Sequence, residues 1–254
     1  GRAARAPCGA HSQARARGAF EPAVRARRYL TPAPIESLPP GAARLMPLPS
    51  PPLLLVTNRR QASAPLDEIL AAAFAAGCRW ASVREKDLPA EDQIALARRL
   101  LPLAQAHGAR LTLHGSPAWA KEAGLRGVHL SAHSDAAAAR ALLGPGALVG
   151  LSVHGVDDVR GLDPAALDYV LAGPAYPTSS KPGYGPFLGP EGIARIASAT
   201  VLPVLAIGGI GPENAAELLA AGAAGLAVMG GIMQSADPAA AVAALLAAFE
   251  RHRP

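Results

Sequence analysis

Two Gly-Gly pairs near the C-terminus have the residue types and spacing of an anion-binding site. Gly208-Gly209 follows the apolar stretch Val201–Ala206, and Gly230-Gly231 follows Gly225–Val228. Paired glycines let backbone N–H groups approach an anion, and the start of a following helix adds the positive end of its dipole. A single pair would be explained as well by a tight turn. Two pairs after consecutive strands predict a phosphate site.

Cationic and hydroxyl side chains gather in two further loops. Arg84-Glu85-Lys86 closes an apolar stretch, and strand alternation places Arg84 and Lys86 on one side and Glu85 on the other. A solvated loop explains that spacing equally well. The segment from Tyr176 to Pro186 carries Thr178, Ser180 and Lys181, which is typical of a lid over an anion.

His154, in the stretch Ser152-Val153-His154, is the candidate acid/base. A histidine at the end of a strand can exchange a proton near neutral pH. On position alone a structural role is at least as plausible for it. His114 and His129 also end strands and face the same choice with weaker support.

These residues need a scaffold, and short apolar stretches alternating with Ala/Leu-rich segments predict one. Helices are expected at Leu66–Ala76, Glu91–Ala106, Asp135–Leu143, Pro212–Ala221 and Pro238–Arg251. Strands are expected at Leu53–Thr57, Trp80–Arg84, Arg110–His114, Gly127–Leu130, Ala147–Ser152, Asp168–Ala172, Val201–Ala206 and Gly225–Val228.

About eight strand–helix units in one chain of 254 residues favour a single (β/α)₈ TIM barrel of the α/β class. A doubly wound open sheet is the competing architecture. In a barrel the function lies on the loops after the strands, where all the residues above are found.

Charge separates the chain into two parts. The net charge of +5 would suggest a nucleic-acid partner if it lay on the folded part of the chain. Residues 1–50 hold eight Arg and two acidic residues, however, so residues 51–254 carry a net charge of −1. We therefore expect no nucleic-acid partner. Residues 1–50 are interpreted as an Arg/Ala/Pro-rich disordered extension and residues 51–254 as the barrel domain. A transit peptide, or upstream sequence ahead of a start at Met46, stays open, as does whether residues 1–45 belong to the native protein.

Several other classes find no support. The two cysteines, Cys8 and Cys78, form no framework, and no apolar stretch is long enough for a membrane span. Serine-hydrolase, P-loop and zinc-site motifs are missing. A cytoplasmic location is the default expectation, and the oligomeric state is left open.

The ordered motifs resemble the thiamine phosphate synthase/TenI superfamily of small TIM barrels over residues 53–250. The matching stretches are Leu54-Leu55-Val56-Thr57, Val83-Arg84-Glu85-Lys86, Gly127-Val128-His129-Leu130, Gly150-Leu151-Ser152-Val153-His154, Asp168-Tyr169-Val170, Pro177-Thr178-Ser179-Ser180-Lys181, Val204-Leu205-Ala206-Ile207-Gly208-Gly209-Ile210, Ala221-Gly222-Ala223 and Ala236-Asp237-Pro238.

The resemblance implies one of two activities. Synthases of the superfamily join thiazole phosphate to hydroxymethylpyrimidine pyrophosphate with the help of Mg²⁺. Their Asn-Asp pair is matched here by His114-Gly115, and a second acidic residue by Ser134, with Asp135 one position late. Because Mg²⁺ requires hard oxygen ligands, these departures count against a synthase. TenI-type thiazole tautomerases need no metal and use the histidine matched by His154.

The leading hypothesis is therefore a TenI-type thiazole tautomerase, an isomerase without a cofactor. Thiamine phosphate synthase, a transferase that would use Mg²⁺, is the alternative, and a non-catalytic phosphate-binding or regulatory protein is the third. The substrate is expected to be a small phosphorylated thiazole. Its phosphate would bind at Gly208, Gly209, Gly230 and Gly231, and its other groups at Arg84, Lys86, His114, Ser152, Thr178, Ser180 and Lys181.

Overall fold

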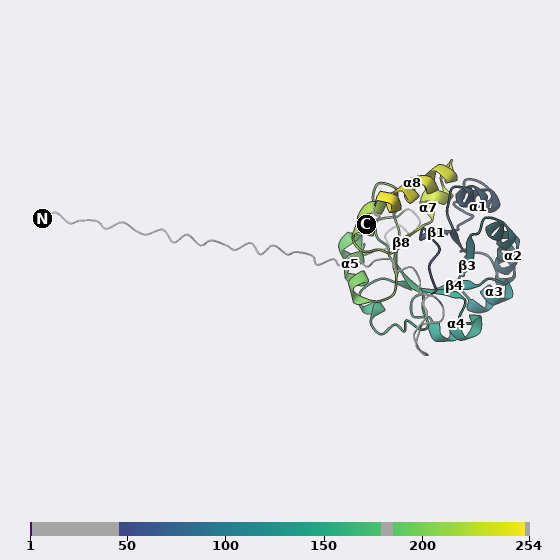
Figure 1. Ribbon diagram of the computed structural model, residues 1–254, viewed down its shortest axis with the longest axis horizontal. Coiled ribbons are helices and arrows are strands. Elements are labelled where there is room, and N and C mark those ends of the chain that lie inside the picture. The colour runs from purple at the N-terminus through teal and green to yellow at the C-terminus, as the bar shows by residue number, and fades with distance from the viewer. Residues whose placement is uncertain (2–45, 179–184, 252–254) are drawn as a thin grey trace, which may run out of the picture. The chain divides into compact units, whose positions relative to one another are not determined.

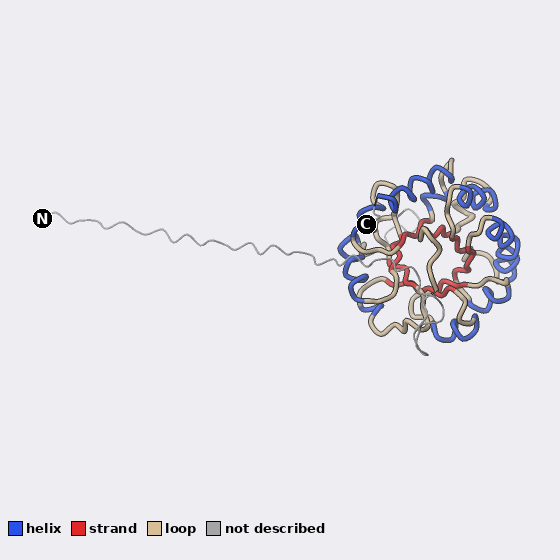
Figure 2. Tube along the Cα trace, viewed as in Figure 1, coloured by secondary structure: helices blue, strands red, loops and turns tan. Residues whose placement is uncertain are grey.

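The computed structural model describes Gly1, residues 46–178 and residues 185–251. Eight parallel strands close into a barrel in sequence order, and β1 pairs with β8 to complete the ring. Helices surround this ring, as Figures 1 and 2 show. The predicted TIM barrel is confirmed, and the open-sheet alternative is wrong because the sheet has no free edge.

The strands are four to six residues long and mostly buried. They are β1 (Leu53–Val56), β2 (Trp80–Val83), β3 (Arg110–His114), β4 (Gly127–Leu130), β5 (Leu148–Val153), β6 (Tyr169–Ala172), β7 (Val204–Ile207) and β8 (Gly225–Val228). The helices are α1 (Leu66–Ala75), α2 (Ala90–Ala106), α3 (Pro117–Glu122), α4 (Ala136–Leu143), α5 (Gly189–Ala199), α6 (Ala215–Ala220), α7 (Gly230–Met233) and α8 (Pro238–Arg251).

Two apolar clusters follow from the alternation of side chains along each strand. The larger cluster lies between the strands and the helices and includes Leu53 and Leu55 of β1. The smaller one includes Leu54, Trp80 and Tyr169. Because neighbouring residues of a strand point to opposite faces, the second set fills the inside of the barrel. The barrel interior is thus packed, and a ligand can enter only at its ends.

Two predicted boundaries differ from the structure by more than one residue, and one connection differs in kind. The strand β7 starts at Val204 rather than Val201, because Pro203 has no N–H to contribute to the ladder and Val201 is exposed. Helix α6 starts at Ala215 rather than Pro212. Between β5 and β6 the described chain forms only the short 3₁₀ turn Asp157–Val159 in place of an α-helix.

The end of the barrel where the strands begin is held by a buried carboxylate. Asp168 accepts hydrogen bonds from the backbone N–H of Met46 at 2.8 Å and of Val149 at 2.7 Å, and it forms an ion pair with Arg140 at 2.7 Å. Met46 and Leu48 also pack against the smaller cluster. The stretch directly before β1 is thereby fixed to the barrel; the predicted boundary at residue 50 stays a prediction.

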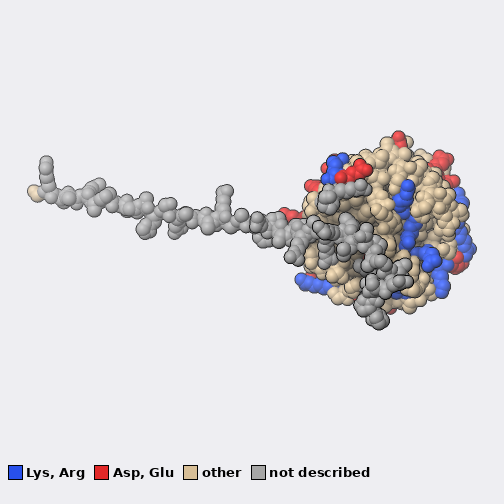
Figure 3. Space-filling view, viewed as in Figure 1, with Lys and Arg blue, Asp and Glu red and all other residues tan. Residues whose placement is uncertain are grey.

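Charges of both signs lie on the face of the barrel that Figure 3 presents. Within the described part of the chain, no helix is long and apolar enough to cross a membrane.

Candidate functional site

A cavity of about 740 Å³ opens where the strands end. Ten of the residues expected from the sequence line it: Arg84, Lys86, His114, Ser152, His154, Thr178, Gly208, Gly209, Gly230 and Gly231. Ser180 and Lys181 lie outside the described residues. These ten residues come from the ends of six strands and are up to 147 positions apart, from Arg84 to Gly231.

The first Gly-Gly pair ends β7 in a conformation that few other residues adopt. Gly208 has a φ of +102° and Gly209 a φ of +63°. A Cβ atom at Gly209 would collide with the carbonyl oxygen of Pro177 and with Tyr176 of the preceding loop. Glycine is therefore required here both by the backbone angles and by the close approach of the loop after β6.

Asn214 keeps that turn in place. Its side-chain oxygen accepts from the N–H of Gly211 at 3.0 Å, and its amide nitrogen donates to the carbonyl oxygen of Gly209 at 2.9 Å. This turn occupies the residues where α6 was predicted to begin, which is why the helix starts later.

The second Gly-Gly pair forms the first turn of α7. Gly230 and Gly231 open this helix directly after Met229. The N–H groups of a first helical turn have no partner within their own helix, so they are available to an anion. Both pairs line the same cavity, which is the arrangement expected for one phosphate group.

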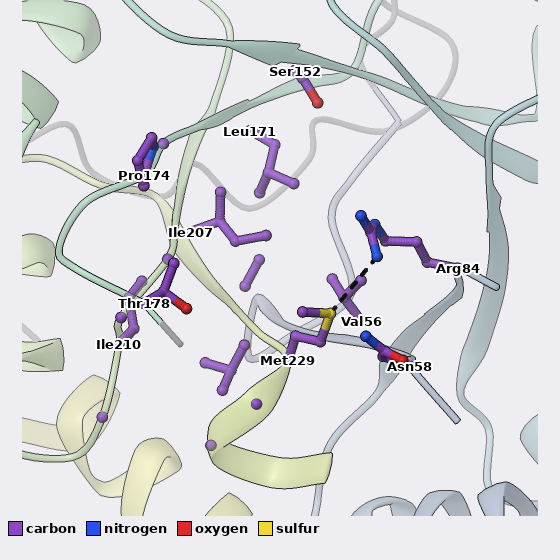
Figure 4. A pocket seen from close by; sticks show the side chains of 18 of the residues that line it. Val56, Asn58, Arg84, Ser152, Leu171, Pro174, Thr178, Ile207, Ile210 and Met229 are labelled. Carbon is purple, nitrogen blue, oxygen red and sulfur yellow. Dashed lines mark hydrogen bonds between the residues drawn. The ribbon is translucent and has the colours of Figure 1, made fainter. Parts of the chain in front are cut away.

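The cationic side of the cavity is formed by Arg84 and Lys86. Glu85, the residue between them, is 1% exposed and points away: it accepts from the hydroxyl of Thr57 at 2.6 Å and from the N–H of Arg59 at 2.9 Å. Burial lowers the pKa of the Arg84 guanidinium from its ordinary value. Figure 4 shows Arg84 reaching across toward the sulfur of Met229, at 4.0 Å.

His154 lies at the exposed rim of the cavity. Its Nδ1 is 2.7 Å from the carbonyl oxygen of Gly173, and its backbone N–H donates to Asp158 at 2.6 Å. A carbonyl oxygen only accepts, so Nδ1 carries the proton in this bond. In the neutral ring Nε2 is then the basic nitrogen, which is the condition for an acid/base group that exchanges protons with a ligand.

The other two strand-end histidines differ in depth. His114 lines the cavity, whereas His129 is completely buried. The centroids of the two imidazole rings are 4.6 Å apart. Nδ1 of His129 is 3.1 Å from the hydroxyl of Tyr169, and Nε2 is 2.9 Å from the hydroxyl of Ser152. Ser152 is one of the residues that line the cavity (Figure 4).

The sequence interpretation did not assign several polar residues that line or support the cavity, Glu213 and Ser235 among them. Asn58, Ser131 and Gln234 line it, and Asn214 shapes the β7 turn. Asn58 and Ser131 directly follow the predicted first and fourth strands, so the rule that strand ends carry function would have found them. Gln234 directly follows the four-residue helix α7, which lies outside the helix ranges expected from the sequence.

The Mg²⁺ ion that the family resemblance implies does not fit the residues present. Among the described residues that line the cavity, Glu213 carries the sole carboxylate. Asp135 is exposed and caps α4, accepting from the N–H of Ala138 at 2.8 Å. No group of three or more His, Cys, Asp or Glu in the described part of the chain could hold a metal ion. The hard ligands that Mg²⁺ requires are therefore not assembled here.

Comparison with known proteins identifies the family of this chain. The family model TMP-TENI, described as thiamine monophosphate synthase, matches residues 53–232. The thiamine biosynthesis bifunctional protein ThiM/ThiE of Symbiobacterium thermophilum is 41% identical over 210 residues, 82% of this chain; the chain spans only 43% of that protein. The thiamine-phosphate synthase of Roseiflexus sp. is 37% identical over 215 residues, which are 83% of this chain and 91% of that protein.

A solved structure agrees with the sequence relatives. The thiamine phosphate pyrophosphorylase from Pyrococcus furiosus superposes with a TM-score of 0.71 at 26% identity, covering 80% of this chain and 96% of that one. The expected superfamily is confirmed. The names of these relatives support the synthase alternative better than the tautomerase hypothesis, and none of them specifically supports the TenI branch.

Proposed function

This chain belongs to the thiamine monophosphate synthase family, and we propose that it is a thiamine-phosphate synthase, a transferase of thiamine biosynthesis. The proposal rests on relatives that carry this name and that the chain matches over most of their length. The observation in this molecule that supports it is that both Gly-Gly loops line one cavity together with Arg84 and Lys86.

The two groups of residues suit the two substrates of that reaction. The amides at Gly208-Gly209 and Gly230-Gly231 would hold the phosphate of the thiazole. Arg84 and Lys86 would hold the pyrophosphate of the pyrimidine substrate. The thiazole nitrogen forms a bond to the exocyclic carbon of the pyrimidine, the carbon–oxygen bond breaks, and pyrophosphate leaves with the electron pair. Cations beside the pyrophosphate stabilise the negative charge that develops on it.

Thiazole tautomerase is the second candidate, and a specific observation favours it. Among the described residues that line the cavity, Glu213 carries the sole carboxylate, whereas His154 is held with Nδ1 bound to Gly173, so that Nε2 would move a proton. A proton shift that aromatises a thiazole carboxylate phosphate needs one placed acid/base and a phosphate anchor. Neither requirement involves a metal ion.

One pair of assays on the purified protein decides between them. The first supplies thiazole phosphate and hydroxymethylpyrimidine pyrophosphate, with Mg²⁺ or with a chelator. The second supplies the thiazole carboxylate phosphate tautomer alone. Formation of thiamine phosphate at an enzymatic rate supports the synthase. Turnover in the second assay alone overturns it in favour of the tautomerase. Binding without turnover in either assay supports a non-catalytic phosphate-binding protein.

A further inference from the structure

A chain of hydrogen bonds leads from the cavity into the closed interior of the barrel. Ser152 lines the cavity, His129 lies beneath it with its side chain 0% exposed, and Tyr169 lies deepest, also 0% exposed. The contacts are 2.9 Å between Ser152 Oγ and His129 Nε2 and 3.1 Å between His129 Nδ1 and the Tyr169 hydroxyl. None of these three side chains has another hydrogen-bond partner among the described contacts. The buried polar atoms of His129 and Tyr169 must therefore find their hydrogen-bond partners among these three side chains.

Neighbouring residues position the Tyr169 ring so that its hydroxyl reaches His129. Gly150, which faces both residues in the strand register, leaves the space that the ring occupies; a Cβ atom there would overlap it. Trp80 packs edge-on against the ring, with centroids 4.9 Å apart and planes at 83°. The hydroxyl group thus has a fixed position, and its contact with His129 is built into the core.

Burial fixes the protonation of both rings. It lowers the pKa of His129 to about 3, so the imidazole is neutral at physiological pH. It raises the pKa of Tyr169 above its ordinary value, so the phenol keeps its proton. A neutral imidazole donates from one nitrogen and accepts at the other. The chain can therefore run in only two directions.

The two directions differ in whether a buried proton is left without an acceptor. If His129 Nδ1–H donated to Tyr169, the buried phenolic O–H would have no acceptor among the described contacts, and an unsatisfied buried donor is destabilising. If Tyr169 donates to Nδ1, then Nε2–H donates to Ser152 and every buried donor is satisfied. In that second direction the Ser152 oxygen already accepts from below. Its own O–H must point elsewhere, and the cavity is open to it.

We propose that Tyr169 and His129 are positioning residues that turn Ser152 into a hydrogen-bond donor to the bound ligand. Ser152 would then select a ligand that presents an acceptor at this point, such as an oxygen of a phosphate, pyrophosphate or carboxylate group. The direction of the chain is independent of the reaction; assigning the acceptor to a substrate oxygen rests on the proposed function.

The direction of the chain can be measured without any ligand. In protein labelled with ¹⁵N-histidine, the ring nitrogen shifts of His129 report which nitrogen carries the proton, and the variant His129→Gln identifies its signals. We expect a neutral ring protonated at Nε2 from pH 5 to pH 8. In Tyr169→Phe, which keeps the ring but loses the hydroxyl, the preference for Nε2 should be reduced. A wild-type ring protonated at Nδ1 would overturn the proposal.

The effect on binding is measured with inorganic pyrophosphate as the probe, by calorimetry. We expect Ser152→Ala to weaken binding about tenfold, as for a lost hydrogen bond to a charged group. Tyr169→Phe should weaken it less, about threefold, because the serine can then point either way. In the double variant Tyr169→Phe adds nothing to Ser152→Ala, which is the signature of residues that act through one another.

A matched control separates this effect from a general loss of stability. Thr112 is also completely buried inside the barrel and accepts from Trp80 Nε1 at 3.3 Å. The variant Thr112→Val should lower stability comparably and leave pyrophosphate affinity and the His129 signals unchanged. If Tyr169→Phe retains wild-type affinity, or if its effect adds to that of Ser152→Ala, the positioning role is wrong.

Failure of the proposed function looks different from failure of this inference. A protein that binds pyrophosphate with the expected pattern but makes no thiamine phosphate keeps the positioning role and loses the synthase reaction. A wild-type protein that does not bind pyrophosphate contradicts both the synthase reaction and the assigned ligand, whatever direction the ring nitrogens report.

Discussion

His154 Nδ1 donates a hydrogen bond of 2.7 Å to the carbonyl oxygen of Gly173, which links the ends of β5 and β6. This bond fixes both the orientation and the tautomer of an exposed imidazole at the rim of the cavity. The residue that carries this ring lines the cavity, so the bond holds a candidate acid/base group at the site.

The first prediction concerns this imidazole. If the protein is a tautomerase, His154→Ala should lower its turnover about a hundredfold or more, because general acid–base groups contribute on that scale. Phosphate binding should change little, since the Gly-Gly loops are untouched. Steady-state kinetics and calorimetry with the same substrate measure the two effects. His107→Ala, at the end of α2, is the control; tautomerisation that survives intact in His154→Ala would remove the proposed role.

The second prediction tests the glycine turn after β7. Gly209→Ala should destabilise the protein and weaken phosphate binding at least tenfold, because the new methyl group would displace the loop at Pro177. Gly108→Ala is a matched control: Gly108 has a similar φ of +60° but no neighbouring atom within 4 Å. Both variants should lose about 1 kcal/mol from backbone strain. Only Gly209→Ala should affect binding, as measured by phosphate titration; equal binding by both variants would contradict the assignment.

The third prediction concerns the cationic side. Arg84→Gln and Lys86→Gln should each weaken pyrophosphate binding, about tenfold for the half-buried Arg84 and less for the exposed Lys86. The salt dependence of binding should fall in parallel. Arg98→Gln removes a surface charge on α2 that pairs with Glu122 at 3.6 Å, and it should have no effect. Binding isotherms at two salt concentrations test this, and a loss in the Arg98 variant of the same size would reveal a non-specific charge effect.

The fourth prediction follows from the buried His129. Its pKa is lowered to about 3 in the folded protein, below the value of about 6.5 in the unfolded chain. Between these values the unfolded state binds one more proton. The contribution of the neutral, buried His129 to the free energy of unfolding is therefore fully present above pH 6.5. It is lost as the pH falls, by up to about 1.4 kcal/mol per pH unit.

Replacing that ring should make the protein less sensitive to acid. Urea unfolding of His129→Gln between pH 7 and pH 4 should show a shallower loss of stability than the wild type, even though the variant is less stable at pH 7. His107→Gln should keep the wild-type slope. An unchanged slope in His129→Gln would show that the ring is not buried in its neutral form.

The predictions made from the sequence succeeded where the signal was local. Alternation along β2 placed Arg84 and Lys86 at the cavity with Glu85 elsewhere, and the Gly-Gly pairs marked the ends of β7 and β8. The start of α6 was missed because the side chain of Asn214 closes a turn ahead of it. A competition between a side-chain hydrogen bond and a helical turn is decided by energies that a pattern of residue types does not contain.

The amino-acid sequence by itself determined the barrel, the end of it at which the cavity opens, and the family. Each of these depends on periodicity or on motifs within single strand–loop units. The tertiary structure alone decided the contacts between units. It placed Gly150 beside both His129 and Tyr169, which lie 40 positions apart, and it left the imidazole of His154 exposed while burying that of His129. The physical reason is strand register: closing the barrel sets which side chains share a layer, and a one-residue shift would separate them.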